Sequence, residues 1–530
     1  MISPETITHG EARPRLRAIA LCLVALAALS VVSRLPQLRS PNLLLDGDEC
    51  VLGLMAKHVS QGRELPIFFY GQHYGFSTVE AGAGALAFLM FGTSAAALKS
   101  AMLALWTLGV LFLFLALARR LGTGPSFAIA AVFVLTPAWA VWSMKARGGY
   151  LTAFAATAVL MWLLAAGRGR RSMWHWVAAG VLTSVIYLAQ PLWLPGILPF
   201  LVAAAVSDRR LSWLAGYLAA AAAPAVAARL ATVSSPEAWL GPGFDHETLA
   251  RVVPDMALQV YVNLTGSYYL ASTVQPPGAA TAGLAWMWSL LLPLALLLQM
   301  YRLAARRYNA TTHLLFASIV LTLLAEALTL RARDGRYLLP LSAPLVLLVG
   351  AELVDLVAVR VVSRSAAAVA AIVLMLLGAQ SMWEFRSFSF LWSNPPRSWS
   401  EARRMEQVLN YLKVRDVRYV FSMNGLLDPQ LIFYSDEHVL GRSTYPDGRY
   451  PPYVGATNRA LASGERVAVV GYTNTSGAPG CWDVPICTGG IENLVRDSSD
   501  IYTVDGKYFV YAGADSDLLE KLHFRWLTAY

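Results

Sequence analysis

The chain has 530 residues, of which 56% are hydrophobic and only 14% are charged. Soluble globular proteins carry about 25% charged residues, so this composition excludes a single water-soluble core and predicts a polytopic membrane protein. The net charge of +9 does not indicate nucleic-acid binding. The Lys and Arg residues stand in short clusters between apolar segments, as the positive-inside rule predicts for cytoplasmic loops.

Eleven apolar segments are predicted to span the membrane, since a span needs about 20 mostly apolar residues. They are residues 17–34, 98–118, 124–143, 150–166, 174–190, 192–207, 211–230, 282–301, 312–330, 337–358 and 365–383. The first follows an arginine-rich N-terminus, and we interpret it as an uncleaved signal anchor. With the N-terminus inside, the basic clusters all fall in cytoplasmic loops. These clusters are residues 119–120, 168–171, 208–210, 302–307 and 360–364.

This topology requires that residues 80–92 do not cross the membrane. The segment is about half a span long, so we expect a helix that lies on or dips into the outer leaflet. If it crossed, residues 119–120 would lie outside and the charge pattern downstream would break. The predicted outward regions are the first loop (35–97), residues 145–150, 231–281 and 331–337, and the C-terminal region.

The composition changes sharply near residue 384. The alternating runs 418–422, 466–472 and 507–512, bounded by Gly, Asn and Asp, predict strands, and an amphipathic helix is expected at 400–413. The chain is therefore predicted to contain a mainly α membrane bundle, residues 1–383, and a small extracytoplasmic α/β domain, residues 384–530. Cys481 and Cys487 could pair if that domain faces an oxidising compartment.

Three carboxylates, Asp46, Asp48 and Glu49, follow the first predicted span and open a helical pattern of apolar residues. An acidic residue at a helix start caps free N–H groups and favours the positive end of the helix dipole, worth about 1 kcal/mol. Capping therefore explains one carboxylate as well as catalysis does. Three within four positions exceed what capping needs, and such close like charges call for a cation, a proton or a cationic partner.

The first outward loop continues with the polar and aromatic stretch 69–80. Tyr70, Gln72, His73, Tyr74 and Glu80 are candidate substrate-binding residues there. Tyr and Gln side chains are suited to hydrogen bonds with sugar hydroxyls, and His73 is an additional candidate acid/base group or ligand. An interfacial aromatic belt is the alternative, but it accounts only for the tyrosines.

Two further outward loops are basic, against the positive-inside bias. One reads KARGGY over residues 145–150, where the glycines leave backbone N–H groups open to an anion. The other, residues 331–337, carries three arginines, whose forked guanidinium groups suit phosphate. Arginines at helix ends that snorkel to the interface are the alternative. The candidate binding residues outside the first loop are Lys145, Arg147, Tyr150, Gln190, Arg333, Arg336 and Tyr337.

Together these features resemble the C superfamily (GT-C) of membrane glycosyltransferases, which use polyprenyl-phosphate sugars as donors. The matching residues are Asp48-Glu49 and the segments 70–80, 147–150 and 336–341. The sequence is most similar to the branch of protein O-mannosyltransferases and lipid A aminoarabinose transferases. The resemblance covers roughly the first 380 residues.

The resemblance implies an inverting glycosyltransferase with Asp48 as the base, and Asp46 and Glu49 as secondary candidates. The implied partners are a polyprenyl-phosphate sugar and a glycan, lipid or protein acceptor. No cofactor is expected, because oligosaccharyltransferases of the superfamily carry an Asp-x-Asp metal motif in the second outer loop, which here has no acidic residue. The Asp46-x-Asp48 spacing leaves a divalent cation open. The Ala-, Leu- and Arg-rich composition favours a bacterial inner membrane, with the site on the periplasmic side.

Two other functional classes compete with an enzyme. A transporter or flippase for lipid-linked sugars would place ionisable groups inside its spans. Glu326 and Glu352 are the main groups of that kind in the predicted spans, and both stand near helix ends. A partner that only binds the lipid-linked sugar is the second alternative. It predicts that loss of residues 395–530 abolishes function while substitution of Asp48 does not.

Overall fold

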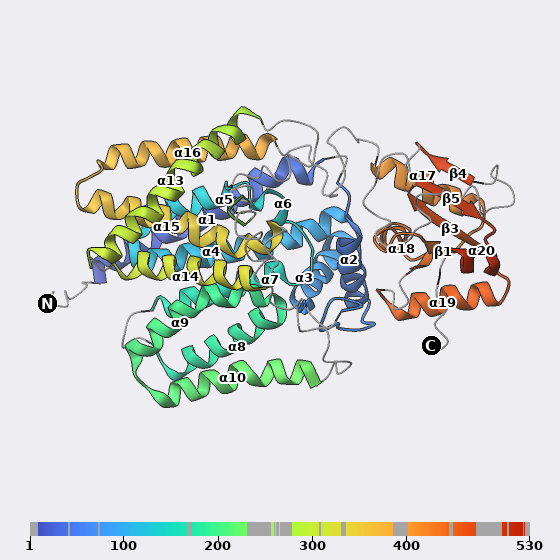
Figure 1. Ribbon diagram of the computed structural model, residues 1–530, viewed down its shortest axis with the longest axis horizontal. Coiled ribbons are helices and arrows are strands. Elements are labelled where there is room, and N and C mark those ends of the chain that lie inside the picture. Colours follow the sequence, from blue (N-terminus) through green and yellow to red (C-terminus); the bar gives the residue numbers. More distant parts are fainter. Residues whose placement is uncertain are drawn as a thin grey trace.

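The computed structural model describes most of the chain. The described residues are 9–40, 43–72, 75–166, 171–230, 256–258, 260, 264, 278–306, 309–329, 335–384, 401–444, 449–472, 501–505, 508–522 and 524. A bundle of helices forms one end of the molecule, and a smaller domain built on a β-sheet forms the other (Figure 1). The predicted fold class, a membrane helical bundle with a small C-terminal α/β domain, is confirmed.

The helical part begins near the N-terminus and ends at Glu384. In chain order its helices are α1 (His9–Leu38), α2 (Gly47–Ser60), α3 (Thr78–Phe91), α4 (Ala95–Leu121), α5 (Thr123–Val134), α6 (Trp139–Trp142), α7 (Tyr150–Leu164), α8 (Met173–Ala189), η1 (Pro191–Trp193), α9 (Leu194–Asp208), α10 (Leu211–Leu230), α13 (Ala279–Ala304), α14 (Ala310–Leu328), η3 (Gly335–Leu338), α15 (Leu339–Ala358) and α16 (Arg364–Glu384).

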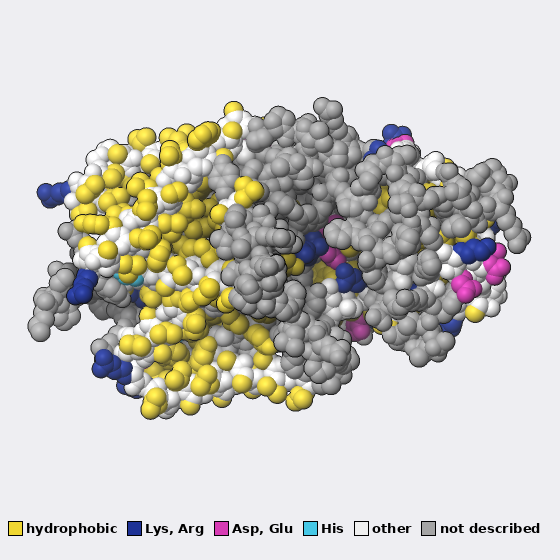
Figure 2. Space-filling model, viewed as in Figure 1, with side chains coloured by type: hydrophobic (Ala, Val, Ile, Leu, Met, Phe, Trp, Pro, Cys, Tyr) yellow, Lys and Arg dark blue, Asp and Glu magenta, His cyan; other side chains and the backbone are white. Residues whose placement is uncertain are grey.

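Large apolar side chains stand on the outside of this bundle. Leu21, Leu290 and Leu376 are 71%, 70% and 65% exposed, and hydrophobic side chains cover the visible face of the bundle in Figure 2. Such a surface would be unstable in water and is expected in lipid. Charged side chains stand instead at the far end of the bundle, at the junction of the bundle with the C-terminal domain, and on that domain (Figure 2). The chain is an integral membrane protein.

Eight helical segments within the described residues are long and apolar enough to cross a membrane. They are Leu16–Leu38, Ala95–Leu121, Pro191–Asp208, Leu211–Ala228, Ala279–Ala304, Ala310–Leu328, Arg336–Ala358 and Arg364–Glu384. Each coincides with a predicted span. The predicted count of eleven is not confirmed, because the other three predicted spans correspond to shorter helices.

One of these three segments was wrongly predicted to be a single continuous helix. The predicted span 124–143 is not one helix but two, α5 and α6, separated by residues 135–138. Pro137 explains the break, since proline lacks an N–H and disfavours helical geometry at the residue before it. The other two are α7 and α8, which pack within the bundle against α4 and α10.

Helix α3 covers most of the segment 80–92, for which a helix short of a full span was predicted. Its 14 residues extend about 21 Å at 1.5 Å per residue, whereas the hydrocarbon core is about 30 Å thick. One side packs on α2 and α4, while Leu89 and Phe91 are each 69% exposed. This asymmetry suits a helix that lies at the membrane surface; its placement in the outer leaflet stays a prediction.

The C-terminal domain contains a five-stranded sheet in the order β2-β1-β3-β5-β4. Its elements are α17 (Glu401–Val414), β1 (Tyr419–Ser422), α18 (Leu427–Tyr434), β2 (Leu440–Ser443), α19 (Pro451–Ala462), β3 (Val467–Tyr472), β4 (Ile501–Val504), β5 (Tyr508–Ala512) and α20 (Ser516–Lys521). Strand β1 runs parallel to β2 and β3, whereas β5 runs antiparallel to β3 and β4. The three predicted strands correspond to β1, β3 and β5. Strands β2 and β4 were not predicted, and the sequence of β2, LGRS, resembles a loop.

The C-terminal domain docks on the bundle through α18, which faces α2 (Figure 1). The two helices approach closely because glycines stand at the contact. A Cβ atom on Gly47 would lie 2.3 Å from the Leu426 carbonyl oxygen, and one on Gly53 would lie 2.6 Å from the Phe433 ring. The Gln430 amide donates to the Leu45 carbonyl at 2.8 Å. This contact places the C-terminal domain next to the start of α2, which carries Asp46, Asp48 and Glu49.

Candidate functional site

Asp46 is the N-cap of α2, and it forms a capping box with Glu49. Its Oδ1 accepts the Glu49 N–H at 2.9 Å, and Glu49 Oε2 accepts the Asp46 N–H at 3.2 Å. Asp46 Oδ2 also pairs with Lys145 Nζ at 2.7 Å. Burial alone would raise the pKa of Asp46, but the charges of Lys145 and Arg147 hold it well below its usual range. Capping therefore accounts for two of the three carboxylates.

Asp48 lies between two arginines that come from different parts of the chain. Its Oδ2 pairs with Arg147 Nη2 at 2.6 Å, and its Oδ1 pairs with Arg449 Nη2 at 3.0 Å. Arg449 belongs to the C-terminal domain, so that domain completes the surroundings of Asp48. The Asp48 side chain is 12% exposed, compared with 9% for Asp46 and 0% for Glu49. Of the three carboxylates, Asp48 is thus the most accessible to a substrate.

Glu49 is buried beneath the other two carboxylates. Its Oε1 pairs with Lys99 of α4 and accepts the Ala146 N–H at 3.2 Å. The Glu49 and Lys99 side chains are both fully buried. A buried carboxylate with a cation and two backbone donors is held rigidly, so Glu49 ties together α2, α4 and the loop before α7.

These residues form one charged cluster, named the Asp48 cluster from here on. Its members are Asp46, Asp48, Glu49, Lys99, Lys145, Arg147 and Arg449. Four cationic side chains surround three carboxylates, so the cluster carries one excess formal positive charge. That excess, beside a partly exposed carboxylate, suits the binding of an anionic group such as a phosphate.

The loop that carries Lys145 and Arg147 has a defined backbone. Gly148 and Gly149 adopt φ values of +56° and +87°, a region that favours glycine. A Cβ atom on Gly149 would also lie 3.0 Å from Ala189. The Gln190 amide donates to the Gly148 carbonyl at 3.0 Å. Gln190, predicted as a substrate contact, thus supports the loop that carries Lys145 and Arg147.

Glu80, another predicted substrate contact, caps helix α7. Its carboxylate accepts the N–H groups of Gly149 at 3.1 Å, Leu151 at 3.0 Å and Thr152 at 3.2 Å. These are the donors that a helix start leaves open. Because Glu80 is fully buried, its pKa is raised to about 7 despite these hydrogen bonds. Through these hydrogen bonds, Glu80 fixes the loop that carries Arg147.

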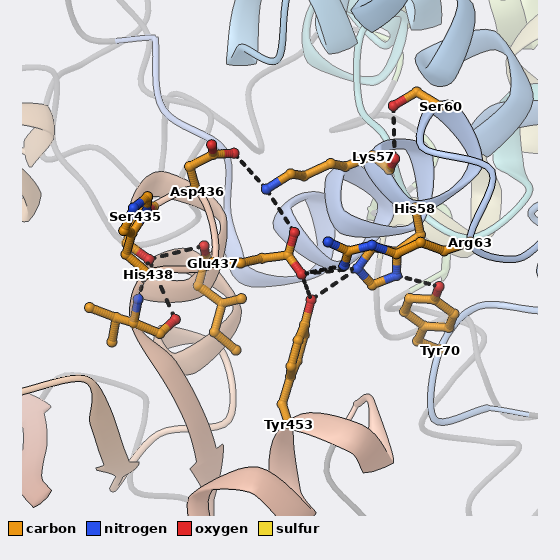
Figure 3. Close-up of polar contacts among 12 residues, drawn as sticks. Lys57, His58, Ser60, Arg63, Tyr70, Ser435, Asp436, Glu437, His438 and Tyr453 are labelled. Carbon is orange, nitrogen blue, oxygen red and sulfur yellow. Dashed lines mark hydrogen bonds and ion pairs between the residues drawn. The ribbon is translucent and has the colours of Figure 1, made fainter.

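Tyr70 joins a second polar group, formed where α2 meets the C-terminal domain (Figure 3). His58 Nδ1 lies 2.8 Å from the Tyr70 hydroxyl, and its Nε2 lies 3.0 Å from the Tyr453 hydroxyl. Tyr453 in turn donates to Glu437 Oε1 at 2.6 Å. Lys57 pairs with Glu437 at 2.7 Å. These contacts fasten the C-terminal domain to α2.

The remaining predicted site residues are less closely tied to the Asp48 cluster. Tyr150 is buried with its ring 4.9 Å from that of Trp142. Gln72 is partly buried, and its backbone N–H donates to Phe69 at 3.0 Å. Arg336 Nη2 donates to the Tyr337 hydroxyl at 3.0 Å, on the turn before α15. Three predicted positions, His73, Tyr74 and Arg333, and the predicted pairing of Cys481 with Cys487 lie outside the described residues.

Two members of the cluster were missed by the sequence reasoning. Lys99 stands inside the predicted span 98–118, and an ionisable residue in a span is itself a signal of function. Only Glu326 and Glu352 were considered as the main ionisable residues in the predicted spans, so Lys99 was overlooked. Arg449 carries no such signal, because only the docking of the C-terminal domain brings it to Asp48. Glu352, considered as a transport residue, pairs with Arg302 at 2.9 Å.

An apolar cavity opens among α4, α7, α9, α14 and α15. Its lining includes Phe154, Trp193, Phe200 and Pro340. Pro340 in this lining is four residues along the chain from Arg336, the candidate phosphate-binding arginine. Its lining suits an apolar chain.

No protein-family model matches this sequence, and no curated protein matches it. Solved structures do match its fold. ArnT from Cupriavidus metallidurans bound to undecaprenyl phosphate aligns over 94% of this chain and 98% of its own, with 13% identity and a TM-score of 0.55. Its apo state aligns equally far, with a TM-score of 0.54. The oligosaccharyltransferase of Archaeoglobus fulgidus aligns over 86% of this chain and 68% of its own, at 15% identity and a TM-score of 0.48.

The match to ArnT extends through the bundle and the C-terminal domain, since it covers 94% of the chain. The lipid A aminoarabinose transferases are the branch that the sequence motifs resemble. The predicted resemblance is therefore confirmed at the level of the fold, and the chain has an ArnT-like GT-C fold.

Proposed function

We propose that this protein is a glycosyltransferase that moves a sugar from a polyprenyl-phosphate donor to an acceptor hydroxyl at the outer face of the membrane. The observation that carries the proposal is Asp48, held between Arg147 and Arg449 in a bundle of ArnT-like fold. A carboxylate suits the activation of a hydroxyl, and the arginines suit a phosphate leaving group. The undecaprenyl phosphate in the ArnT crystal supports this class of donor.

The ion pairs of Asp48 suggest how the donor would prepare the site. The phosphate of an arriving donor competes for the guanidinium groups of Arg147 and Arg449, which offer bidentate donors. As these groups turn to the phosphate, Asp48 loses counter-charges and becomes a better proton acceptor. Donor binding would thus activate Asp48 as a base. Without a donor, Asp48 remains ion-paired with Arg147 and Arg449.

The proposed reaction is a single displacement. The acceptor hydroxyl gives its proton to Asp48 while its oxygen bonds to the anomeric carbon. The bond between that carbon and the phosphate oxygen breaks, its electron pair leaves with polyprenyl phosphate, and the anomeric configuration inverts. A positioned base contributes about 10²–10⁴-fold to the rate. Arg147 and Arg449 stabilise the developing phosphate charge, and Arg336 is a further candidate for this role.

The apolar cavity supports the lipid part of the proposal. Its apolar lining would accommodate part of a polyprenyl tail, and Pro340 in that lining is four residues from Arg336, which would then lie close to the phosphate. The remaining tail would lie in the bilayer. This placement puts the scissile bond at the outer end of the bundle, on the side that we propose is periplasmic in a bacterial inner membrane.

We propose that the reaction needs no resident metal ion. The Asp46-x-Asp48 spacing does not fit a divalent site here, because both carboxylates face cationic side chains, Lys145 at 2.7 Å and Arg147 at 2.6 Å. These cations would repel a second positive ion. The described residues also contain no group of three His, Cys, Asp or Glu side chains placed to share a metal. The arginines would supply the charge that a metal supplies elsewhere.

The test is release of lipid phosphate by the purified full chain. The protein would be reconstituted with a panel of undecaprenyl-phosphate monosaccharides, and undecaprenyl phosphate would be measured with and without cell-envelope lipid extract as acceptor. Asp48→Asn is expected to lower release by about 10²–10⁴-fold. Asp505→Asn, an exposed carboxylate of the C-terminal domain, is the matched control and should match the wild type.

Two outcomes would overturn the proposal. Full sugar transfer by Asp48→Asn at matched expression would remove the assigned base. Retention of every donor intact, together with movement of the lipid-linked sugar between leaflets, would instead favour the flippase. The same reconstituted vesicles therefore distinguish a flippase from a glycosyltransferase.

A further inference from the structure

His58 stands in the last turn of α2, between two tyrosine hydroxyls (Figure 3). Its Nδ1 lies 2.8 Å from the Tyr70 hydroxyl, and its Nε2 lies 3.0 Å from the Tyr453 hydroxyl. Nε2 also lies 3.3 Å from Glu437 Oε1. The His58 side chain is fully buried, so bulk water does not complete its hydrogen bonds. These neighbours therefore decide how many protons the ring carries.

The proton of each tyrosine hydroxyl points to a carboxylate rather than to His58. Tyr70 donates to Glu64, and Tyr453 donates to Glu437 Oε1 at 2.6 Å. Burial and these carboxylates raise the pKa of both tyrosines well above its usual range, so the hydroxyls keep their protons. A hydroxyl has one proton to donate and two lone pairs that accept. Each tyrosine can therefore only accept a hydrogen bond from His58.

The carboxylate beside Nε2 does not supply a proton to His58 either. Burial alone would raise the pKa of Glu437, but hydrogen bonds from the side chains around it, His58 first among them, hold it well below its usual range. An ionised carboxylate only accepts hydrogen bonds. Both ring nitrogens must therefore donate, which requires the doubly protonated imidazolium form of His58.

The charges around His58 favour the same form. Among the described residues, two permanent cations and three carboxylates from α2, the loop after it and the C-terminal domain form ion pairs at this contact. They are Lys57 and Arg63, and Glu64, Asp436 and Glu437. Lys57 pairs with Asp436 at 2.5 Å, and Arg63 pairs with Glu437 at 2.8 Å. A third cation, the imidazolium of His58, balances the third carboxylate.

Helices α3 and α18 also pack on α2, and their ionisable residues have other neighbours. Glu80 of α3 accepts backbone N–H groups at the start of α7. In α18, the Tyr434 hydroxyl accepts the Leu45 N–H at 2.7 Å, and Asp428 interacts electrostatically with Arg449. The hydrogen-bond argument for His58 is therefore independent of these groups.

We propose that His58 is a pH-sensitive latch, which fastens the C-terminal domain to α2 as an imidazolium and releases it on losing a proton. Released from the domain, His58 would titrate as an ordinary histidine, whereas the docked arrangement needs both ring protons. The docked state thus binds more protons than the released state, so docking weakens as the pH rises. The stabilisation is fully present below about pH 6, where a free histidine is mostly protonated, and is lost above it.

The latch would regulate the proposed active site through the C-terminal domain. The Tyr450 ring centroid lies 5.0 Å from that of His58, and the preceding residue, Arg449, pairs with Asp48 at 3.0 Å. On the basis of the proposed function, release of the domain withdraws Arg449 from Asp48 and lowers activity. Acid conditions would therefore keep the site complete, and alkaline conditions would open it.

The first test is the protonation state of His58 in the wild-type chain. NMR of the full chain in nanodiscs, with ¹⁵N-labelled histidine, distinguishes a doubly protonated ring from a neutral one. The chain has eight histidines, and the signal that is missing in His58→Gln identifies His58. At about pH 7.5, where a free histidine is mostly neutral, both His58 nitrogens should carry a proton. A neutral His58 at this pH would overturn the proposal.

Hydrogen exchange then tests the latch. At a pH where NMR finds His58 doubly protonated, the amides of α18 should exchange about tenfold faster in His58→Gln than in the wild type, since charged hydrogen bonds are roughly twice as strong as neutral ones. At a higher pH where His58 is neutral, the two proteins should exchange alike. Each comparison is made at one pH, so Asp428, whose pKa burial raises to about 7, titrates equally in both proteins.

The matched control is His438→Gln, which changes an exposed histidine next to Glu437 and should match the wild type at both pH values. Equally faster exchange of His58→Gln at both pH values would indicate a structural contact only and overturn the latch. So would wild-type exchange of His58→Gln at the lower pH.

Activity separates the latch from the proposed function. Release of undecaprenyl phosphate should be about tenfold faster in the wild type than in His58→Gln at the lower pH, following the difference in exchange, and equal in both at the higher pH. A pH-dependent difference in exchange with no donor cleaved would retain the latch and overturn the glycosyltransferase. Donor cleavage together with a pH-independent difference in exchange would overturn the latch and leave the glycosyltransferase standing.

Discussion

The buried pair of Glu49 and Lys99 predicts a large loss of stability from a small change. Glu49→Gln keeps the shape of the side chain but removes the carboxylate that neutralises Lys99, and both side chains are fully buried. Removing one partner of a buried ion pair costs about 3–5 kcal/mol, because it leaves a buried charge uncompensated. Loss of the hydrogen bond to the Asp46 N–H would add about 1 kcal/mol, the usual worth of a cap.

The assay is thermal unfolding of the detergent-purified chain, followed by intrinsic tryptophan fluorescence. Glu49→Gln should unfold at a clearly lower temperature than the wild type. The double variant Glu49→Gln with Lys99→Met removes both charges and should regain most of the loss, since replacing a whole buried pair is often neutral. Wild-type stability of Glu49→Gln would refute the reasoning, as would a double variant no more stable than the single one.

Three further predictions test the surroundings of the site. Arg449→Ala should lower the rate of undecaprenyl phosphate release by about 10²–10³-fold, as loss of one stabilising group does, and Arg466→Ala should not. Glu80 has a folded-state pKa raised from 4.5 to about 7, so the folded state is less stable by about 3 kcal/mol above pH 7 than below pH 4.5. Unfolding temperatures measured from pH 5 to 8 should fall in the wild type and stay flatter in Glu80→Gln. Gly47→Ala should loosen the C-terminal domain, seen as faster hydrogen exchange in α18, whereas Gly82→Ala, with nothing near its Cβ position, should not.

Much of the fold follows from patterns that are local in the sequence. Apolar segments of about 20 residues predict spans, and eight of them coincide with long apolar helices in the part of the chain that the structure describes. The start of α2 was predicted from Asp46 and the helical spacing after it, and its capping box confirms that start. The break at Pro137 shows a limit, since the apolar run continues across it and hides the change of direction.

The surroundings of the site could be predicted only in part, because its contacts join distant residues. The sequence placed Asp48 and Arg147 on one side of the membrane, and they form an ion pair. Their types alone could not show that Glu80 caps α7 or that Gln190 holds Gly148. Those roles depend on which backbone donors and acceptors the packing leaves open. A polar side chain near a site is therefore as readily a support for its loops as a contact for substrate.

The position of Arg449 changes how one experiment is interpreted. The binding-only alternative predicts that loss of residues 395–530 abolishes function while substitution of Asp48 does not. Because Arg449 pairs with Asp48 at 3.0 Å, the enzyme too should lose activity without this domain. The deletion would also expose the apolar contact of Phe433 with α2, which invites misfolding. Substitution of Asp48 therefore separates the two functions, because a binding partner does not need a base and an enzyme does.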